Sequence, residues 1–216
     1  MPTVSQPYLD ELRPMLEALV DVVRLLARQG WTPATSSNFS LRCDEQTFLI
    51  SASGLDKGDL TPDDFLPVDA EGRPLQPETF RGQPSAETLL HGWVYRRFPR
   101  ARVVLHTHSV SGTVLGKLYQ SEGRLLLTGY EMLKVFEGID THEATVMVPV
   151  FPNSQDMKTL AAEIDNWYHA HTDQPLYGFL LAGHGLYCWG DSPAQARRYA
   201  ETFEFLFECT LKLRGH

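Results

Sequence analysis

The segment Val103-Val104-Leu105-His106-Thr107-His108 is the part of the chain that best defines its fold and chemistry. Its first residues are β-branched or aliphatic and predict a buried strand, and it ends in a His-x-His pair. Residues i and i+2 of a strand point to the same face, so His106 and His108 are expected to project together. Two adjacent neutral imidazoles form half of a transition-metal site, although such a pair can also be ordinary polar residues at a sheet margin.

A third candidate ligand lies downstream, in Phe179-Leu180-Leu181-Ala182-Gly183-His184-Gly185. This is a second apolar strand, and its histidine stands between two glycines. Three histidine ligands leave the fourth position of a zinc ion open, which is typical of a catalytic site. The pair His169 and His171 lies in a predicted helix, where i and i+2 diverge by about 200°, and we interpret it as a polar helix end.

The composition of the chain is that of a globular enzyme with a single domain over residues 1–216. Hydrophobic residues make up 43% and charged residues 21% of the 216 positions. The net charge of −8 argues against nucleic acid or an anionic membrane as the main partner, while a small anionic substrate remains open. The sequence contains no C-x-x-C pair, leader segment or membrane-spanning run, so we expect a protein of the reducing cytoplasm.

The pattern of apolar residues predicts helices that alternate with strands. Helices are expected over 8–29, 84–95, 111–119 and 131–136, before Asp173, and from Ser192 onward, with Ser85 and Ser192 as N-caps and Asn153 or Ser154 capping the helix before Asp173. Strands are expected near 38–41 and over 47–51, 103–107, 145–150, 178–182 and 186–189. We therefore predict an α/β fold whose mixed, largely antiparallel sheet is flanked by helices. The chain contains no dinucleotide fingerprint or P-loop.

These motifs together resemble the class II, metal-dependent sugar-phosphate aldolases and their relatives. The resemblance covers nearly the whole chain and rests on five elements in the family's order: Asn38, Ser53-Gly54, Pro84-Ser85-Ala86-Glu87, His106-Thr107-His108 and Gly183-His184-Gly185. The subgroup that is most similar dehydrates a ketose phosphate with a methylthio group in methionine salvage. Ser109 and the segments Gly129–Lys134 and His184–Gly190 indicate this subgroup. The resemblance implies an α/β/α fold and a homotetramer with active sites near subunit interfaces.

The resemblance also implies roles for particular residues. It implies one zinc ion per subunit, held by His106, His108 and His184, although imidazoles also suit manganese, iron or cobalt. Glu131 matches the dehydratases' catalytic carboxylate, and Glu87 matches a carboxylate beside the metal; either could instead be an ordinary acid at the start of a helix.

The phosphate group of the substrate requires its own set of residues. The family positions that surround it correspond to Asn38, Ser53, Gly54 and Ser85, and Ser85 at a helix N-terminus is also a physically sound anion site. Lys57 is close enough in sequence to add charge, although a loop lysine is more often simply solvated. For Asn38 and Ser53 the alternative is ordinary turn chemistry.

Two other functions remain open. A sugar-phosphate aldolase or epimerase, for example of the fuculose or ribulose phosphate type, would use the same metal and phosphate pocket. Many such aldolases use a tyrosine near the C-terminus, whereas the last tyrosine here, Tyr199, lies inside the final predicted helix. A non-catalytic domain like the heads of adducins need not retain metal ligands. Gly129 and Tyr130 also replace a His-Gln pair that some dehydratases carry before the same glutamate.

Overall fold

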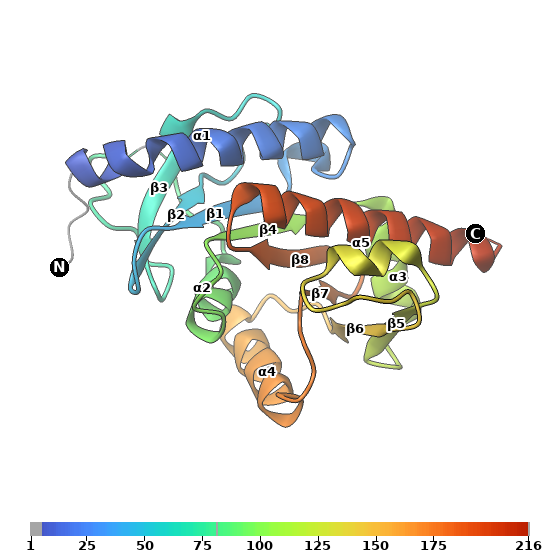
Figure 1. Cartoon of the computed structure of the whole chain (residues 1–216). Helices are drawn as coiled ribbons and strands as arrows, with labels where there is room; N and C mark the ends of the chain where they lie inside the picture. The colour runs from blue at the N-terminus through green and yellow to red at the C-terminus, as the bar shows by residue number, and fades with distance from the viewer. Residues whose placement is uncertain (1–5, 81, 216) are drawn as a thin grey trace.

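The computed structural model describes residues 6–80 and 82–215 and contains one eight-stranded sheet (Figure 1). The strand order is β3-β2-β1-β4-β8-β7-β6-β5. Among the strands of the described residues, only β6 and β7 pair in parallel, which confirms the prediction of a mixed, largely antiparallel sheet. The strands are β1 (Asn38–Arg42), β2 (Thr47–Ser51), β3 (Phe65–Asp69), β4 (Val103–Thr107), β5 (Arg124–Thr128), β6 (Thr145–Phe151), β7 (Gly178–Leu181) and β8 (Gly185–Gly190).

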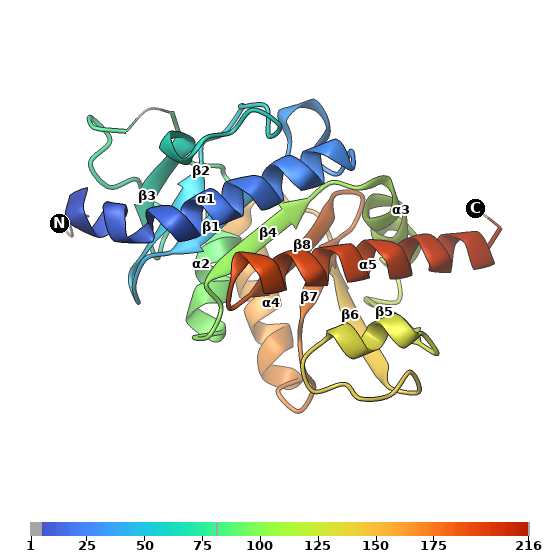
Figure 2. The same cartoon turned by 45° about the horizontal axis from the view of Figure 1, so that its top comes forward.

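Helices cover both faces of this sheet. Helices α1 and α5 lie over one face, and α2 and α4 lie over the other, so the fold has the expected α/β/α layers (Figures 1 and 2). None of the described helices is long and apolar enough to cross a membrane. The α-helices are α1 (Gln6–Arg28), α2 (Thr88–Arg97), α3 (Val110–Leu118), α4 (Met157–Ala170) and α5 (Pro193–Leu213), and the 3-10 helices are η1 (Pro33–Thr35), η2 (Pro62–Asp64) and η3 (Glu131–Val135).

The two faces of the sheet belong to two separate hydrophobic clusters. In β4, Val103 and Leu105 pack in the cluster that includes α1 and α5, whereas Val104 packs in the cluster that includes α2 and α4. Side chains alternate along a strand, so His106 shares the face of Val104. The periodicity that buries β4 on both sides therefore directs its histidine toward α2.

Helix α2 begins later than the sequence predicts. It starts at Thr88, with Glu87 as the N-cap residue, so Ser85 is not the cap. The hydroxyl of Ser85 instead accepts a hydrogen bond from the backbone N–H of Glu87 at 3.3 Å. This turn is what brings the Glu87 side chain to the end of the helix that faces β4.

The other two predicted caps had different outcomes. Ser192 caps α5 as expected, because its side chain accepts a hydrogen bond from the backbone of Gln195. For α4 the expectation of Asn153 or Ser154 is wrong, since the side chain of Asp156 accepts from the first backbone N–H groups of that helix. Asn, Asp and Ser are about equally good caps, so position decides, and Asp156 is the residue directly before the first residue of the helix, Met157.

The topology separates the two ends of the sheet. Thr107 at the end of β4 pairs with Leu186 near the start of β8, and Leu181 at the end of β7 pairs with both Gly185 and Phe151. The C-terminal ends of β4, β6 and β7 thus meet at one end of the sheet. Strand β5 is antiparallel to β6, and its last residue pairs with the first residue of β6, so β5 ends at the opposite end.

Candidate functional site

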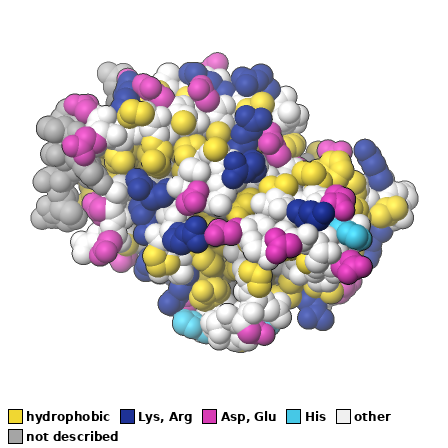
Figure 3. Space-filling view, in the orientation of Figure 1, with side chains coloured by type: hydrophobic (Ala, Val, Ile, Leu, Met, Phe, Trp, Pro, Cys, Tyr) yellow, Lys and Arg dark blue, Asp and Glu magenta, His cyan; other side chains and the backbone are white. Residues whose placement is uncertain are grey.

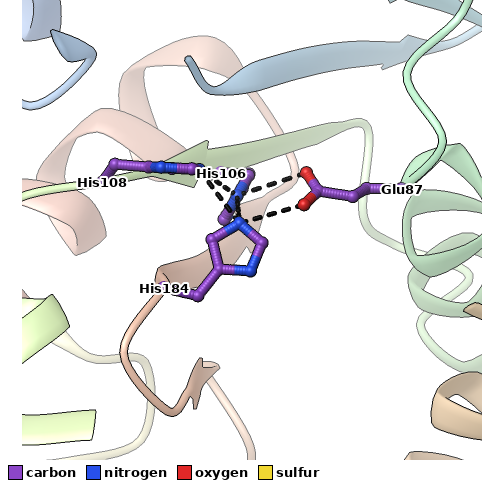
Figure 4. Close-up of side chains that lie close together, drawn as sticks. All are labelled: Glu87, His106, His108 and His184. Atoms are coloured by element: carbon purple, nitrogen blue, oxygen red, sulfur yellow. Dashed lines mark hydrogen bonds and ion pairs between the residues drawn. The ribbon is translucent and has the colours of Figure 1, made fainter. Parts of the chain in front are cut away.

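The three predicted histidine ligands converge at the C-terminal end of β4 (Figure 4). The Nε2 atom of His106 lies 2.7 Å from that of His108 and 3.2 Å from that of His184, and the third side of this triangle is 3.1 Å. Strand β4 and the residue after it supply two of the rings, and the turn between β7 and β8 supplies the third. The fold therefore brings His184 to the other two histidines, which precede it by 78 and 76 residues in the chain.

The opposite ring nitrogens of two of these histidines have hydrogen-bond partners that fix their orientation. Nδ1 of His106 donates to the carbonyl oxygen of Leu186 at 3.0 Å. Nδ1 of His184 donates to Oδ1 of Asn153 at 3.2 Å. With hydrogens on Nδ1, both rings present a lone pair on Nε2 toward the centre, which is the arrangement that metal ligands require.

Burial keeps His106 and His108 in the form that binds metal. His106 is fully buried, and burial lowers its pKa well below the ordinary value. Burial, together with the charge of His184, lowers the pKa of His108 to about 4. At neutral pH both rings are therefore uncharged and available as ligands.

Glu87 completes the group from the start of α2. Its carboxylate oxygens lie 2.9 Å from Nε2 of His184 and 3.4 Å from Nε2 of His106. Burial on its own would raise its pKa, but the contacts with His184, His106 and Asn38 outweigh it and lower the pKa. Glu87 is thus a carboxylate that faces the three imidazoles rather than an ordinary helix-start acid.

These four side chains have the chemistry and spacing of a metal site. The candidate ligand atoms of Glu87, His106, His108 and His184 all lie within 4.8 Å of one another. A tetrahedral zinc ion with bonds of about 2.0–2.1 Å separates its ligand nitrogens by about 3.3 Å, close to the observed spacing. The lone pairs on Nε2 of His106 and His184 face each other at 3.2 Å and repel unless a cation lies between them. The site therefore fits a divalent transition metal.

Two of the four predicted phosphate residues lie beside this group. Nδ2 of Asn38 donates to the carboxylate of Glu87 at 2.7 Å and to the hydroxyl of Ser85 at 3.2 Å. Ser53 and Gly54 lie in the exposed loop after β2, where the backbone N–H of Ser53 donates to Gln83 at 2.9 Å. That bond holds the loop against the segment that leads into α2.

Lys57 is buried, although most lysines in loops are solvated. Its side chain is 1% exposed, and Nζ donates to the carbonyl oxygens of Leu55 at 2.7 Å and Thr35 at 3.0 Å. Burial lowers its pKa, and its charge contributes to the lowered pKa of His108. Lys57 therefore adds positive charge close to the metal group.

Comparison with known proteins identifies the family. The model of the class II aldolase and adducin N-terminal domain matches residues 17–211. The chain belongs to the class II aldolase and adducin family. The family's fold agrees with solved structures: l-fuculose-1-phosphate aldolase from Thermus thermophilus superposes with a TM-score of 0.71 at 27% identity, covering 94% of this chain and 96% of that one. YgbL from Escherichia coli superposes with a TM-score of 0.75 at 24% identity, covering 93% and 90%, and supports the fold alone.

The curated relatives within the family are more similar in sequence. A protein of Stenotrophomonas maltophilia named methylthioribulose-1-phosphate dehydratase is 50% identical, over 99% of this chain and 98% of its own length. A Xanthomonas campestris protein of the same name is 49% identical, over 98% and 95%. The resemblance to the dehydratases of this family is thereby confirmed.

Glu131 lies far from the metal group (Glu87, His106, His108 and His184) of its own subunit. It begins η3, three residues after β5, at the end of the sheet opposite the histidines. The seven residues of β6 alone separate the two ends by about 20 Å. The side chain of Glu131 is 71% exposed and pairs with Lys134 at 2.7 Å and with His142 at 3.5 Å. Its own chain therefore gives Glu131 no route to the histidines.

The sequence analysis missed three residues that support the site. Asn153 orients His184, and Tyr187 stacks on the ring of His106 with 4.0 Å between centroids. His91, one helical turn after Glu87, bonds to Asn38. The sequence does hold a signal for His91: it follows Glu87 by four residues in a predicted helix, so the two side chains lie on one face of that helix.

Proposed function

We propose that this family member is a methylthioribulose-1-phosphate dehydratase. It removes water from 5-methylthioribulose 1-phosphate and forms 2,3-diketo-5-methylthiopentyl 1-phosphate, a step of methionine salvage. The proposal is carried by the intact group of three convergent histidines and Glu87, in a chain about half identical over its full length to relatives of that name. A non-catalytic domain has no need of three imidazoles whose Nε2 atoms converge at one point.

The cofactor in this proposal is one zinc ion per subunit, held by His106, His108 and His184. Zinc would polarise the C2 carbonyl and so acidify the proton on C3. Of the three cysteines of the chain, Cys188 and Cys209 are free thiols, and Cys43 is buried. Free thiols suit the reducing cytoplasm, which is the compartment we propose.

The reaction also needs groups that move protons. The hydrogen on C3 leaves as a proton and the hydroxyl on C4 departs with a proton as water, and the resulting enol becomes the diketone. A general acid/base contributes about 10²–10⁴-fold to such a step. Glu87 is a carboxylate beside the site and can accept a proton, and Glu131 is the candidate that protonates the departing hydroxyl.

The phosphate of the substrate would bind near Lys57. The described residues place no carboxylate in an ion pair with this buried ammonium group. A phosphate would therefore supply its missing counter-charge. Ser85 and Asn38 lie at the N-terminal end of α2, where the helix dipole favours an anion. The exposed side chain of Ser53 and the backbone N–H of Gly54 complete the proposed phosphate pocket.

Glu131 would act on the metal centre of a neighbouring subunit in a homotetramer. Its distance from its own histidines and its exposure support this arrangement. Helix α3, which begins two residues after His108, supports it further. Its exposed apolar side chains Val110, Val114 and Leu118 recur every four residues on one face. In the single chain the pairing with Lys134 lowers the pKa of Glu131. Burial against a neighbour would raise this pKa toward the range of a general acid.

Further copies of the chain are the macromolecular partners that this function requires. Figure 3 shows the face formed by α1 and α5, on which basic and acidic side chains are interspersed. This face thus lacks the continuous basic surface that binds nucleic acid. The open groove between these helices has a volume of about 570 Å³ and carries both Arg197 and Glu201.

The first experiment measures diketone formation from 5-methylthioribulose 1-phosphate by zinc-loaded protein. We expect turnover that a chelator abolishes and zinc restores, and that Lys57→Met weakens through a higher KM. Lys158→Met is the matched control, because Lys158 is an exposed lysine on α4. Release of an aldehyde and a triose phosphate instead of the diketone would make the protein an aldolase and refute the proposal.

The structure favours dehydration over the aldolase chemistry for one specific reason. The last tyrosine of the chain, Tyr199, is buried, and its hydroxyl accepts a hydrogen bond from the backbone N–H of Glu137 at 3.1 Å. It therefore cannot serve as the exposed C-terminal proton donor that many aldolases of this class use.

A mixing experiment tests the shared active site. His184→Ala and Glu131→Gln should each be inactive alone, while oligomers reassembled from equal amounts should regain about a quarter of the wild-type activity. This fraction arises because half of the metal centres are intact and half of their neighbours carry the glutamate. A mixture that stays inactive, although both variants assemble together, would place Glu131 in its own subunit or outside the reaction.

A further inference from the structure

A buried chain of hydrogen bonds leads away from the metal group between β1 and α2. From Glu87 it passes to Asn38 at 2.7 Å and then to Nε2 of His91 at 2.5 Å. From Nδ1 of His91 it continues to the hydroxyl of Ser40 at 2.7 Å, and from there to the hydroxyl of Tyr95 at 2.7 Å. Asn38, Ser40, His91 and Tyr95 are all buried, and none belongs to the metal group.

The periodicities of the two elements explain why these residues meet. Asn38 and Ser40 are two residues apart on β1 and share the face that carries His106. Glu87, His91 and Tyr95 recur every four residues along one side of α2. A polar row on the strand therefore faces a polar row on the helix, inside a cluster that is otherwise hydrophobic.

The charge of Glu87 sets the direction of every bond in this chain. A carboxylate only accepts hydrogen bonds, so the amide NH₂ of Asn38 must face it and the amide oxygen must face His91. Nε2 of His91 must then carry the hydrogen, and Nδ1 must accept from Ser40. Ser40 in turn accepts from Tyr95 at 2.7 Å, and the hydroxyl of Tyr95 has a second, longer contact of 3.4 Å with the carbonyl oxygen of Arg102. All four donors thus point toward the metal group.

The ionisation states of the buried groups agree with this order. Burial lowers the pKa of His91 to about 3, so the ring is neutral and has one donor and one acceptor. Burial also raises the pKa of Tyr95, so its phenol keeps the hydrogen that it donates. Every buried donor and acceptor in the chain is then satisfied by one arrangement.

We propose that His91 is a positioning residue of the active site, whose Nε2–H tautomer holds the Asn38 amide with its NH₂ toward Glu87 and Ser85. This inference rests on the proposed function and deepens it. If the amide turned over, its oxygen would face the carboxylate of Glu87, and the two acceptors would repel each other. The carboxylate would then lose its fixed orientation toward His106 and His184. His91 thus acts on the reaction through Asn38 and Glu87 without touching the substrate.

Two substitutions of His91 separate this role from simple filling of the core. Gln can place an amide NH₂ close to the position of Nε2 and can still donate to Asn38. Asn places its oxygen close to Nδ1 and keeps only the bond from Ser40. We expect His91→Gln to keep kcat and zinc affinity within about threefold of wild type, while His91→Asn lowers one or both roughly 10–100-fold. Tyr95→Phe, which shortens the chain only at its far end, serves as the control for a lost buried hydroxyl.

Nuclear magnetic resonance of ¹⁵N-histidine-labelled protein supplies a readout that does not depend on activity. The signals of His91 are assigned by their absence from the His91→Gln spectrum, and we expect the Nε2–H tautomer at neutral pH. An Nδ1–H tautomer would overturn the proposal, and so would equal effects of Gln and Asn on both kcat and zinc affinity. If wild-type protein lacked dehydratase activity, the proposed function would fail, while the tautomer and the zinc affinities would still decide the role of His91.

Discussion

The substitution His91→Gln is expected to change how the stability of the metal-free protein depends on pH. The folded protein keeps the imidazole neutral because burial lowers the pKa of His91 to about 3, whereas the unfolded chain binds a proton near the ordinary value of about 6.5. As the pH falls below 6.5, His91 binds a proton in the unfolded state but stays neutral in the folded state. Stability is therefore lost progressively, and the loss ends only near pH 3.

The size of this effect follows from the two pKa values. At pH 5 the protonated form of the unfolded ring is favoured about 30-fold over the neutral form, which stabilises the unfolded chain by about 2 kcal/mol relative to pH 7. Glutamine does not titrate. The difference in unfolding free energy between wild type and His91→Gln should thus shift by about 2 kcal/mol in favour of the variant.

Urea unfolding of both proteins at pH 7, 6 and 5 measures this difference. A chelator is present throughout, and the protein concentration is held constant so that assembly contributes equally to both. Groups that titrate in both proteins cancel in the comparison. A difference that stays constant from pH 7 to pH 5 would mean that His91 is protonated in the folded state, and it would refute the assignment of a neutral ring.

Three further predictions concern single side chains. Gly185→Ala should abolish metal binding, measured as zinc content. A Cβ atom at this position would lie 1.9 Å from the carbonyl oxygen of Thr107 and would push β8, with the neighbouring His184, away from β4. A variant that retains its zinc would contradict the observed contact of β4 with β8. Ser192→Ala removes the N-cap of α5 and should cost about 1 kcal/mol of unfolding free energy in urea, with turnover per folded subunit unchanged. Val114→Glu places a charge in the apolar stripe of α3 and should dissociate the oligomer in sedimentation experiments, with loss of activity; an active single subunit would remove the role proposed for Glu131.

The metal group could be predicted from the sequence because its signals are local. The alternation of side chains along Val103–Thr107 suffices to bring His106 and His108 together, and the glycines on either side of His184 indicate a tight turn. The sheet was predicted less completely, since β3 and β5 were not identified. The first contains Pro67, which weakens the pattern of a strand, and the second is the short apolar run Arg124–Thr128 between turns.

Other properties of the site depend on contacts between distant segments and could not be predicted. The buried ammonium group of Lys57 binds the carbonyl oxygens of Thr35, before β1, and Leu55, after β2. No local sequence pattern indicates this contact. The position of Glu131 follows from the antiparallel pairing of β5 with β6. The bond between Asn38 and His91 joins residues 53 positions apart, and it appears only once β1 packs on α2.

The convergence of His106, His108 and His184 has a consequence for the lifetime of the protein in a cell. A bound ion would fasten the end of β4 to the turn between β7 and β8, and ligand present at 100 times its dissociation constant stabilises the folded state by about 2.7 kcal/mol. Proteases act on the opened chain, whose population rises about 100-fold when that stabilisation is withdrawn. The abundance of this protein should therefore follow the supply of metal, so that cells starved of it lose the protein by degradation as well as its activity.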